Sequence, residues 1–337
     1  MKKIIFVLLI LALGVALVHI FRSHNKKYCN RSFDPQTWDS CNNTQFTSEH
    51  FDIQLLPYEE LPYAYQFVST PTKTTDDEGV PLHNFRGTLN YHPVHLAQRG
   101  LKFLAIYKNT GDKSYYERLV KTIEKLEGIS LKVDSAIYFP YTFNFALHGC
   151  RKETMRPPWY SGMAQGQALS LIIRTYESTG EKKYLDLSHR LFKSFTNLKG
   201  EGYEPWISCV DAEGNLWLEE YPMELPCFTL NGMIFGIYGI YDYYRITNNE
   251  LAKEYLLASL LTIKKNIHKF RHKGGVSYYC LKHQNFNATN PEYHKVHIRQ
   301  LGMLYKFTGD EYFKEMQEKF VDDTKEENQG DSAESQR

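Results

Sequence analysis

Residues 91–100 read Tyr-His-Pro-Val-His-Leu-Ala-Gln-Arg-Gly, and residues 293–302 read Tyr-His-Lys-Val-His-Ile-Arg-Gln-Leu-Gly. The two stretches agree at six of ten positions, so the chain repeats itself. A weaker third copy, Trp-Tyr-Ser-Gly-Met-Ala-Gln-Gly, occupies residues 159–166. Because each copy opens an apolar stretch about one helix long, we predict that each copy starts a helix.

A turn signature follows each of the three apolar stretches, and it occurs a fourth time between the copies at 159–166 and 293–302. Thr-Gly and an acidic residue end the turns at 109–112, 178–181 and 307–310, and the turn at 246–249 has Asn in place of Gly. Gly and Asn tolerate the left-handed backbone that commonly ends a helix. The turns lie about 60 to 70 residues apart, a period typical of stacked helical hairpins. We therefore predict a mainly α fold, an (α/α) toroid or barrel of helical hairpins, with the binding site at the end opposite the turns.

The charge of the chain argues against several classes of partner. Among 337 residues, Lys and Arg number 40 and Asp and Glu number 39. A chain this close to neutrality lacks the basic field of a nucleic-acid-binding protein, so we predict no nucleic-acid partner. Aromatic residues make up 15% of the chain. They serve equally well to pack helices together or to stack on sugar rings, and composition does not separate these roles.

An apolar run without charge covers residues 4–21, with Lys2 and Lys3 before it and Arg22 after it. Eighteen residues just span a bilayer. We expect residues 1–27 to be an uncleaved single-pass anchor, with the domain on the exported side, in a periplasm or Golgi lumen. A cleaved signal peptide is the alternative. Cys29 and Cys41 bracket a short loop beyond the run, where a disulfide is plausible in an exported domain.

The rest of the chain divides by composition. Residues 28–88 read as a stalk and a short β-rich segment, 89–322 as the (α/α) catalytic domain, and 323–337 as a disordered tail. Alternation predicts a strand or hairpin arm at 135–145, and a Gly-Gly pair predicts a turn feeding a strand at 274–281. Neither a phosphate-binding loop nor a metal-ligand spacing is evident, so we predict no cofactor and no metal.

Four ordered motifs resemble the D-glucuronyl C5-epimerase family of heparosan and heparan sulfate biosynthesis. They are residues 156–168, containing Trp-Tyr-Ser-Gly-Met-Ala-Gln-Gly-Gln-Ala; Glu219-Glu220-Tyr221-Pro222 with Leu230-Asn231-Gly232; Tyr279-x-Leu281-Lys282-His283; and Tyr293-His294-x-x-His297-Ile298-x-Gln300-Leu301. The resemblance covers roughly residues 91–320. It implies a β-rich N-terminal part, a C-terminal (α/α) barrel and a homodimer.

The resemblance also implies site residues. The family's active-site tyrosines correspond to Tyr221, Tyr279 and Tyr293, and its acidic neighbour corresponds to Glu220. The candidates for substrate binding are Lys282, His283, His294, His297, Arg299, Arg156 and Tyr160. Lys282 stands where the family has Arg, and Arg299 where it has Asn, so the binding detail differs there. The β-rich part is also shorter than in the animal enzymes.

The implied reaction explains these residue types. Inverting C5 of glucuronate to give iduronate removes a proton next to a carboxylate through an enediolate and returns one to the opposite face. We expect Tyr279 and Tyr293 to be the two-face pair, with Tyr221 and Glu220 orienting the substrate or relaying protons. A nearby cation would lower the pKa of a phenol that acts as a base. His297 reads equally well as a buried structural residue.

Other functions remain open from the sequence. A polysaccharide lyase forms the same enediolate but expels the substituent at O4, a glycoside hydrolase needs two opposed carboxylates, and a sugar-binding module needs only the aromatics. His92 and His95, in the first copy of the repeat, read as structural. Glu219 reads as a solvated or helix-capping charge. The predicted substrate is a polyanionic, heparosan-type polysaccharide.

Overall fold

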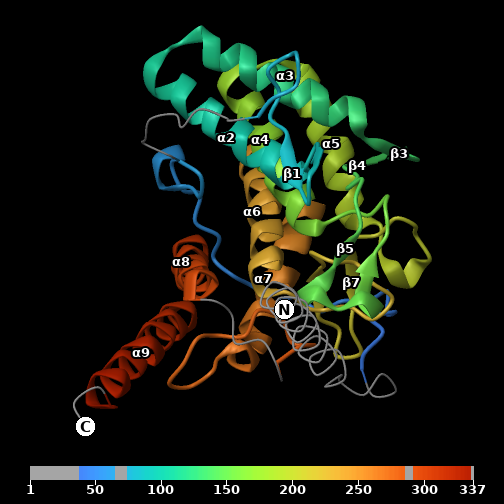
Figure 1. Ribbon diagram of the computed structural model, residues 1–337. Coiled ribbons are helices and arrows are strands. Elements are labelled where there is room, and N and C mark those ends of the chain that lie inside the picture. Colours follow the sequence, from blue (N-terminus) through green and yellow to red (C-terminus); the bar gives the residue numbers. More distant parts are fainter. Residues whose placement is uncertain (1–37, 65–73, 285–290, 335–337) are drawn as a thin grey trace, which may run out of the picture.

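Eight α-helices in four hairpins make up most of the described chain (Figure 1). The computed structural model describes residues 38–64, 74–284 and 291–334. The hairpins are α2 (Pro93–Thr110) with α3 (Lys113–Ile129), α4 (Gly162–Thr179) with α5 (Lys182–Thr196), α6 (Leu230–Thr247) with α7 (Glu250–Phe270), and α8 (Pro291–Thr308) with α9 (Glu311–Glu334). The prediction of a mainly helical fold built from hairpins is confirmed.

The first helices of the hairpins form an inner row. Helix α4 packs against α2 and α6, and α8 packs against α6, while α3, α5, α7 and α9 each pack against the inner helix of their own hairpin. In Figure 1 the row runs from α2 near the top, through α6 in the centre, to α8 at the lower left. All three copies of the repeated segment lie at the start of an inner helix, namely α2, α4 and α8.

Glycines allow α4 and α6 to cross closely. A Cβ atom on Gly166 would lie 2.5 Å from the Cα atom of Gly236, which is closer than real atoms approach. Gly239, one turn along α6, faces Gly166 in the same contact. A larger residue at position 166 would therefore push the two helices apart. It would also move the segments at their N-terminal ends, where the candidate site lies.

The four predicted turns join the helices within the hairpins. Gly111, Gly180 and Asn248 are the C-caps of α2, α4 and α6, with φ of 71°, 70° and 54°. Gly309 follows α8 with φ of 63°. All four lie in the left-handed region that the Thr-Gly and Thr-Asn signals predict. Because all four turns lie at the same end of the helices, the connections between successive hairpins lie at the other end.

Short strands and the 3-10 helices between successive hairpins occupy that opposite end, whereas the first 3-10 helix lies at the turn end, where Lys108 lies over the Tyr58 ring and Lys306 binds Glu60. The four two-stranded antiparallel sheets are β1 (His83–Phe85) with β2 (Thr88–Asn90), β3 (Leu131–Val133) with β4 (Ala136–Tyr138), β5 (Phe145–Ala146) with β6 (Thr154–Met155), and β7 (Ser208–Val210) with β8 (Leu216–Leu218). The 3-10 helices are η1 (Tyr58–Glu60), η2 (Leu147–Gly149), η3 (Arg151–Glu153) and η4 (Lys199–Glu201). Figure 1 shows β3, β4, β5 and β7 on the right-hand side of the molecule.

The strand predictions hold in part. The alternating segment 135–145 contains β4 and the start of β5, but these two strands pair with β3 and β6 and not with each other. The segment 274–281 is not a strand. Its backbone makes an isolated antiparallel bridge from Cys280 to Thr229, the residue before α6. The Gly-Gly pair therefore leads into a loop held against the start of α6.

The segment 38–64, part of the predicted stalk and short β-rich segment at 28–88, packs on the helical domain. The ring of Trp38 lies against Phe228, and Phe51 stacks on Phe313 of α9. Cys41 forms a disulfide with Cys209 of β7, 168 residues away. The predicted pairing of Cys41 with Cys29 is therefore wrong, because Cys41 is buried beside β7.

The chain ends differ from their predictions or lie outside the description. Helix α9 continues to Glu334, so most of the predicted disordered tail 323–337 is helical. Buried Asp323 accepts hydrogen bonds from Arg271 and from the backbone N–H of Gly274, which ties the start of that segment to the domain. The apolar run 4–21 lies outside the described residues. Within the described ranges, no helix is both long enough and apolar enough to cross a bilayer.

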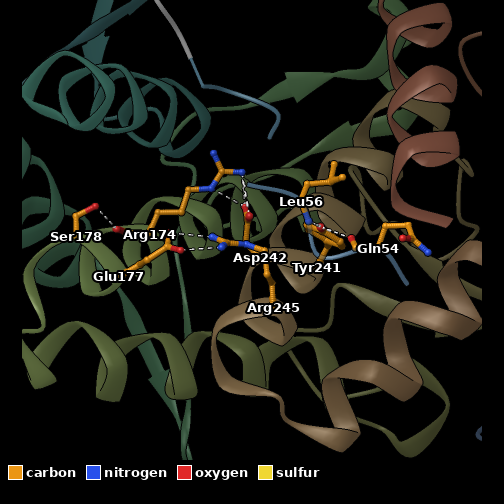
Figure 2. A network of polar contacts seen from close by, with 8 residues as sticks. All are labelled: Gln54, Leu56, Arg174, Glu177, Ser178, Tyr241, Asp242 and Arg245. Atoms are coloured by element: carbon orange, nitrogen blue, oxygen red, sulfur yellow. Dashed lines mark hydrogen bonds and ion pairs between the residues drawn. The ribbon is translucent and has the colours of Figure 1, made fainter. Parts of the chain in front are cut away.

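A buried polar network joins α4 and α6 near the turn end (Figure 2). The guanidinium of Arg174 binds both carboxylate oxygens of Asp242 at 2.9 Å, and neither side chain is exposed. One turn along each helix, Arg245 binds Glu177 at 2.7 and 2.8 Å near the surface. Tyr241 donates to the carbonyl of Gln54 at 2.7 Å, which holds the N-terminal segment on α6.

Candidate active site

Three segments distant in sequence meet at the end opposite the turns, as the repeats predict. Glu220 and Tyr221 follow β8, Tyr279 lies in the loop between α7 and α8, and Tyr293 lies in the first turn of α8. The carbonyl of Tyr279 accepts the N–H of Leu230, the first residue of α6, at 3.1 Å. This bond fixes the loop beside the start of α6.

Glu219 holds the segment after β8 in place. Its backbone N–H donates to Ile207 and its carbonyl accepts from Gly162, both at 2.7 Å. Its carboxyl group accepts the N–H groups of Cys227 at 3.1 Å and Phe228 at 2.9 Å. Glu219 is completely buried, so the prediction of a solvated charge is wrong. This residue anchors the turn that aims Glu220 and Tyr221.

Glu220, Tyr221 and Tyr279 form one hydrogen-bonded cluster. The phenol oxygen of Tyr279 lies 3.1 and 3.2 Å from the two carboxyl oxygens of Glu220, and 3.2 Å from the phenol oxygen of Tyr221. All three residues are buried. Gly232 in the first turn of α6 lies against Glu220, and any side chain there would collide with the carboxyl group. The Gly of the Leu-Asn-Gly motif therefore makes room for Glu220.

Tyr293 lies beside this cluster and is 41% exposed. Its ring meets the ring of Tyr279 edge to face, with centroids 4.9 Å apart. That is ordinary aromatic contact, and it leaves no room for a sugar between the two rings. The expectation that Tyr279 and Tyr293 flank the sugar from opposite faces does not fit this arrangement.

The electrostatics of the cluster come from burial. Loss of solvent raises the pKa of the Glu220 carboxyl to about 7. Burial, followed by the neighbouring Glu220, raises the pKa of Tyr221 and of Tyr279 well above the usual value. The same two causes raise the pKa of Tyr293. A cation that lowers the pKa of the phenols, as the sequence led us to expect, is thus not what controls these groups.

A cavity of about 480 Å³ opens beside the cluster. Among the residues that line it are Glu220, Tyr221, Tyr293, Trp159, Tyr141, Asn231, His83, His92 and His95. Tyr279 is not among the lining residues and lies behind Glu220. The cavity is therefore lined by three tyrosines and one carboxyl group, and its aromatic wall includes the rings of Tyr141 and Trp159, which stack at 3.8 Å.

Three histidines on this cavity were not predicted as site residues. The rings of His83, His92 and His95 lie 4.1 to 5.0 Å apart. Burial, and then mutual repulsion, lowers the pKa of His92 to about 3, and burial and His83 lower that of His95 to about 4. The rings are therefore neutral near pH 7. The first repeat copy places His92 and His95 at one helix start, but it does not show which way their side chains point.

Comparison with known proteins identifies the family. A sequence profile described as the D-glucuronyl C5-epimerase C-terminus matches residues 133–322, more than half of the chain. The chain belongs to the D-glucuronyl C5-epimerase family. A D-glucuronyl C5-epimerase of Caenorhabditis elegans is 26% identical over 193 residues, which are 51% of this chain and 30% of that protein. An uncharacterized protein of Methanocaldococcus jannaschii is 29% identical over 178 residues, 52% of this chain and 54% of that one. The chain thus matches only part of the length of either relative.

Solved structures with a similar fold are more distant. A cellobiose 2-epimerase from Bacillus thermoamylovorans is 11% identical with a TM-score of 0.46, covering 70% of this chain and 62% of that one. A family 76 α-mannanase from Bacteroides thetaiotaomicron is 14% identical with a TM-score of 0.44, covering 72% and 63%. Similarities this distant identify neither a substrate nor a reaction.

Four of the predicted substrate-binding residues have structural partners outside the cavity. Lys282 and His283 bind the two oxygens of Glu153, at 2.9 and 2.8 Å. His294 accepts the N–H of Ser277 at 3.0 Å and donates to the carbonyl of Phe320 at 2.8 Å. His297 lies 2.7 Å from the Ser277 hydroxyl, and burial lowers its pKa to about 3. In this member of the C5-epimerase family, these residues hold the loop before α8 against the domain.

The remaining three candidates divide between a second cavity and the surface. Arg156 and Tyr160 line a cavity of about 590 Å³, with Glu153 and Trp206. Trp159 lines both this cavity and the one beside the tyrosines. Arg299 is exposed on α8 and lines neither. A chain of sugars bound across Trp159 would reach both cavities.

Proposed function

We propose that this protein is a heparosan-glucuronate 5-epimerase, which converts D-glucuronate to L-iduronate at C5 within a heparosan-type polymer. The observation that carries the proposal is the cluster of Glu220, Tyr221 and Tyr279 beside a cavity that Tyr293 also lines. Family membership supports the reaction class. Protonated phenols also suit the substrate, because they approach an anionic uronate without repulsion.

The geometry supports Tyr221 and Tyr293 as the two phenols that face the sugar. Tyr221 would take the C5 proton while its own phenol proton passes through Tyr279 to Glu220, along steps of 3.2 and 3.1 Å. Tyr293, on α8, would give its phenol proton to the opposite face and, being partly exposed, would regain a proton from solvent while Glu220 releases the one it accepted. In the reverse direction the two roles exchange. Glu220 suits this relay because a group with a pKa near 7 accepts and returns a proton at neutral pH.

The substrate carboxylate becomes an enediolate during the reaction and needs hydrogen-bond donors. Within the part of the chain that the structure describes, no Lys or Arg lines the cavity. The donors that line it include the rings of His83, His92 and His95, the amides of Asn231 and Gln98, and the hydroxyl of Ser161. An anion bound beside the histidines would raise their pKa values. We infer that substrate binding draws protons onto this group, which then stabilises the enediolate.

The deciding experiment follows deuterium. Incubation of the protein with heparosan in heavy water should place deuterium at C5 of both epimers, read by NMR. Polymers with N-acetyl and with N-sulfo glucosamine should be run side by side to establish which one the protein prefers. Bound polymer that gains no deuterium would exclude the mechanism. An unsaturated uronate product would show a polysaccharide lyase, the second candidate, which forms the same enediolate.

We also propose that residues 1–27 anchor the protein in a membrane, with the domain on the exported side. The Cys41–Cys209 disulfide supports an oxidising compartment. Deleting residues 1–27 should release an active domain from the membrane fraction. Full-length protein that is entirely soluble and begins beyond the apolar run would show a cleaved signal peptide instead. The homodimer implied by the resemblance is tested by light scattering of the released domain.

A further inference from the structure

Three potential metal ligands from separate segments meet behind the active-site cluster. They are His148 in η2, Cys280 in the loop after α7, and His283 three residues further on, with ligand atoms within 4.8 Å of one another. Cys280 and His283 are buried and His148 is partly buried. The sequence predicts no metal, because residues 148 and 280 lie far apart and only the Cys-x-x-His spacing at 280–283 hints at a site.

The three ligand atoms lie close to the spacing of a tetrahedral centre. The Cys280 sulfur lies 3.5 Å from Nε2 of His148 and 3.1 Å from Nδ1 of His283. A tetrahedral zinc ion, with Zn–S of about 2.3 Å and Zn–N of about 2.0–2.1 Å, requires S···N separations of roughly 3.6 Å. Small side-chain adjustments would therefore bring all three atoms onto one ion.

Glu153 fixes His283 in the form that binds a metal. Its carboxylate oxygen lies 2.8 Å from Nε2 of His283. A carboxylate accepts but does not donate, so Nε2 carries the proton and, in the neutral ring, Nδ1 presents its lone pair to Cys280. A carboxylate on the far nitrogen is the usual outer partner of a metal-binding histidine. Glu153 binds Lys282 as well, at 2.9 Å, which holds the carboxylate in place.

We propose that His148, Cys280 and His283 bind a zinc ion, with Glu153 as the outer partner of His283 and a fourth position for water. One thiolate and two imidazoles favour zinc over the hard cations magnesium and calcium. On binding, the sulfur–metal bond forms as the Cys280 thiol releases its proton to solvent. The ion would join η2 to the loop that carries Tyr279, whose ring lies 5.6 Å from that of His148. The metal would thus position Tyr279.

Metal content and cobalt spectroscopy test the site without reference to activity. The purified wild-type chain should contain about one zinc per molecule, and the metal-free chain loaded with Co²⁺ should show tetrahedral bands and a thiolate-to-cobalt charge-transfer band. Cys280→Ser and His148→Ala should lose the zinc, and Cys280→Ser should lose the charge-transfer band. The matched control is Cys227→Ser, which removes the other buried free thiol and should retain both.

Two further measurements guard against variants that fail to fold. Glu153→Gln keeps all three ligands, so it should retain the charge-transfer band but bind Co²⁺ about 10- to 100-fold more weakly. Removing zinc from the wild type with a chelator should lower its Tm, and returning zinc should restore it. A folded wild-type chain that contains no zinc and shows no thiolate band with Co²⁺ would overturn the proposal. So would a thiolate band that persists in Cys280→Ser.

Discussion

Two buried carboxyl groups near opposite ends of helix α6 differ in how their charge is balanced. Asp242, near the C-terminal end, is bound through both oxygens by Arg174 (Figure 2). Glu220 lies against Gly232 at the N-terminal end, about 15 Å along the axis, and its neighbours are phenols. Asp242 is part of the structural framework, because its charge is paired where no water reaches.

Glu220 is buried and, among the described residues, its hydrogen-bond partners are phenols; burial raises its pKa to about 7, so it remains protonated up to about that pH. A strongly shifted carboxyl group beside a cavity is typical of a catalytic acid or base. The difference between the two carboxyl groups therefore separates the stabilising end of the inner helices from the reactive end. Variants at the two ends should consequently fail in different measurements.

The largest effect should come from the phenols on the cavity. Tyr221→Phe and Tyr293→Phe each remove one hydroxyl and keep the ring, so the fold should persist. Loss of an acid–base group costs about 10²–10⁴ in rate, and deuterium exchange at C5 should fall by that factor. The two variants need not behave alike, because one removes the base for glucuronate and the other the base for iduronate.

Tyr279→Phe distinguishes the two assignments of the pair. If Tyr279 only relays protons, the variant should keep measurable exchange that depends on pH differently. If Tyr279 contacts the sugar, as the sequence led us to expect, it should fall as far as the other two variants. Exchange above about a tenth of wild type in both Tyr221→Phe and Tyr293→Phe, less than any acid–base effect of this size, would remove both from the mechanism.

At the opposite end of the helices, Arg174→Met should act on stability. It leaves Asp242 buried without its partner, which typically costs about 3–5 kcal/mol in the free energy of unfolding. Urea unfolding measures this loss. The exchange rate per folded molecule should stay unchanged, because Arg174 is far from the cavity.

Arg245→Met is the matched control for that variant. Arg245 binds Glu177 across the same two helices, but near the surface. Pairs of that kind contribute about 0–1 kcal/mol, so the loss should be small. Equal losses in the two variants would show that burial is not what distinguishes the pairs.

The pH dependence of stability should reveal Glu220 directly. Its pKa is about 7 in the folded chain against a reference of 4.5, so the folded state holds a proton that the unfolded state releases. Stability should therefore be unaffected by this group below pH 4.5, fall between pH 4.5 and 7, and level off above. A shift of this size corresponds to about 3 kcal/mol. Burial also raises the pKa of the neighbouring Glu219 to about 7, so that carboxyl contributes a similar fall in the same pH window. Glu220→Gln should therefore remove about half of the total fall and Glu219→Gln the other half, as measured by urea unfolding at several pH values.

The same variant should change the activity profile. Exchange needs ionised Glu220 to accept the relayed proton, so wild-type exchange should rise with pH through about 7. Glu220→Gln should lose most of its exchange and all of that rise. Glu219→Gln changes a neighbouring carboxyl that is completely buried but binds only backbone N–H groups. The Glu219→Gln variant should still show exchange that rises with pH. If it does not, the group that titrates near pH 7 is Glu219 and not Glu220.

The parts of this structure that the sequence predicts are those with local causes. Gly111, Gly180, Asn248 and Gly309 end helices because of their own backbone preferences, and each signal lies within a few residues. Tyr293 could be placed at a helix start for the same reason. The resemblance to the family's motifs then assigned Glu220, Tyr221 and Tyr279 to one site at the same end of the domain.

The parts that the sequence missed depend on partners far away along the chain. Lys282 read as a substrate contact because Glu153, its partner, lies 129 residues earlier. Cys41 was paired with a nearby cysteine, whereas its partner Cys209 is 168 residues away. The direction of a side chain is equally invisible, so nothing in the first repeat shows that His92 and His95 turn toward the cavity. Such pairings appear only once the hairpins are stacked.

The smallest effect should come from the second cavity, where charge is exposed to solvent. Arg156 lines that cavity beyond Trp159 and is exposed, so it would meet a carboxylate of the polymer next to the reacting sugar. Exposed ion pairs contribute at most about 1 kcal/mol, or roughly fivefold in affinity. Arg156→Ala should therefore raise KM up to about fivefold at low salt and leave kcat unchanged. The effect should vanish at high salt, because screening shortens the reach of exposed charges.

Arg118→Ala, an exposed Arg on α3 that lines neither cavity, is the matched control and should leave KM unchanged. A fall in kcat with unchanged KM would instead place Arg156 at the reacting sugar, and the contrast between a reactive cavity without Lys or Arg and a charged cavity beside it would fail.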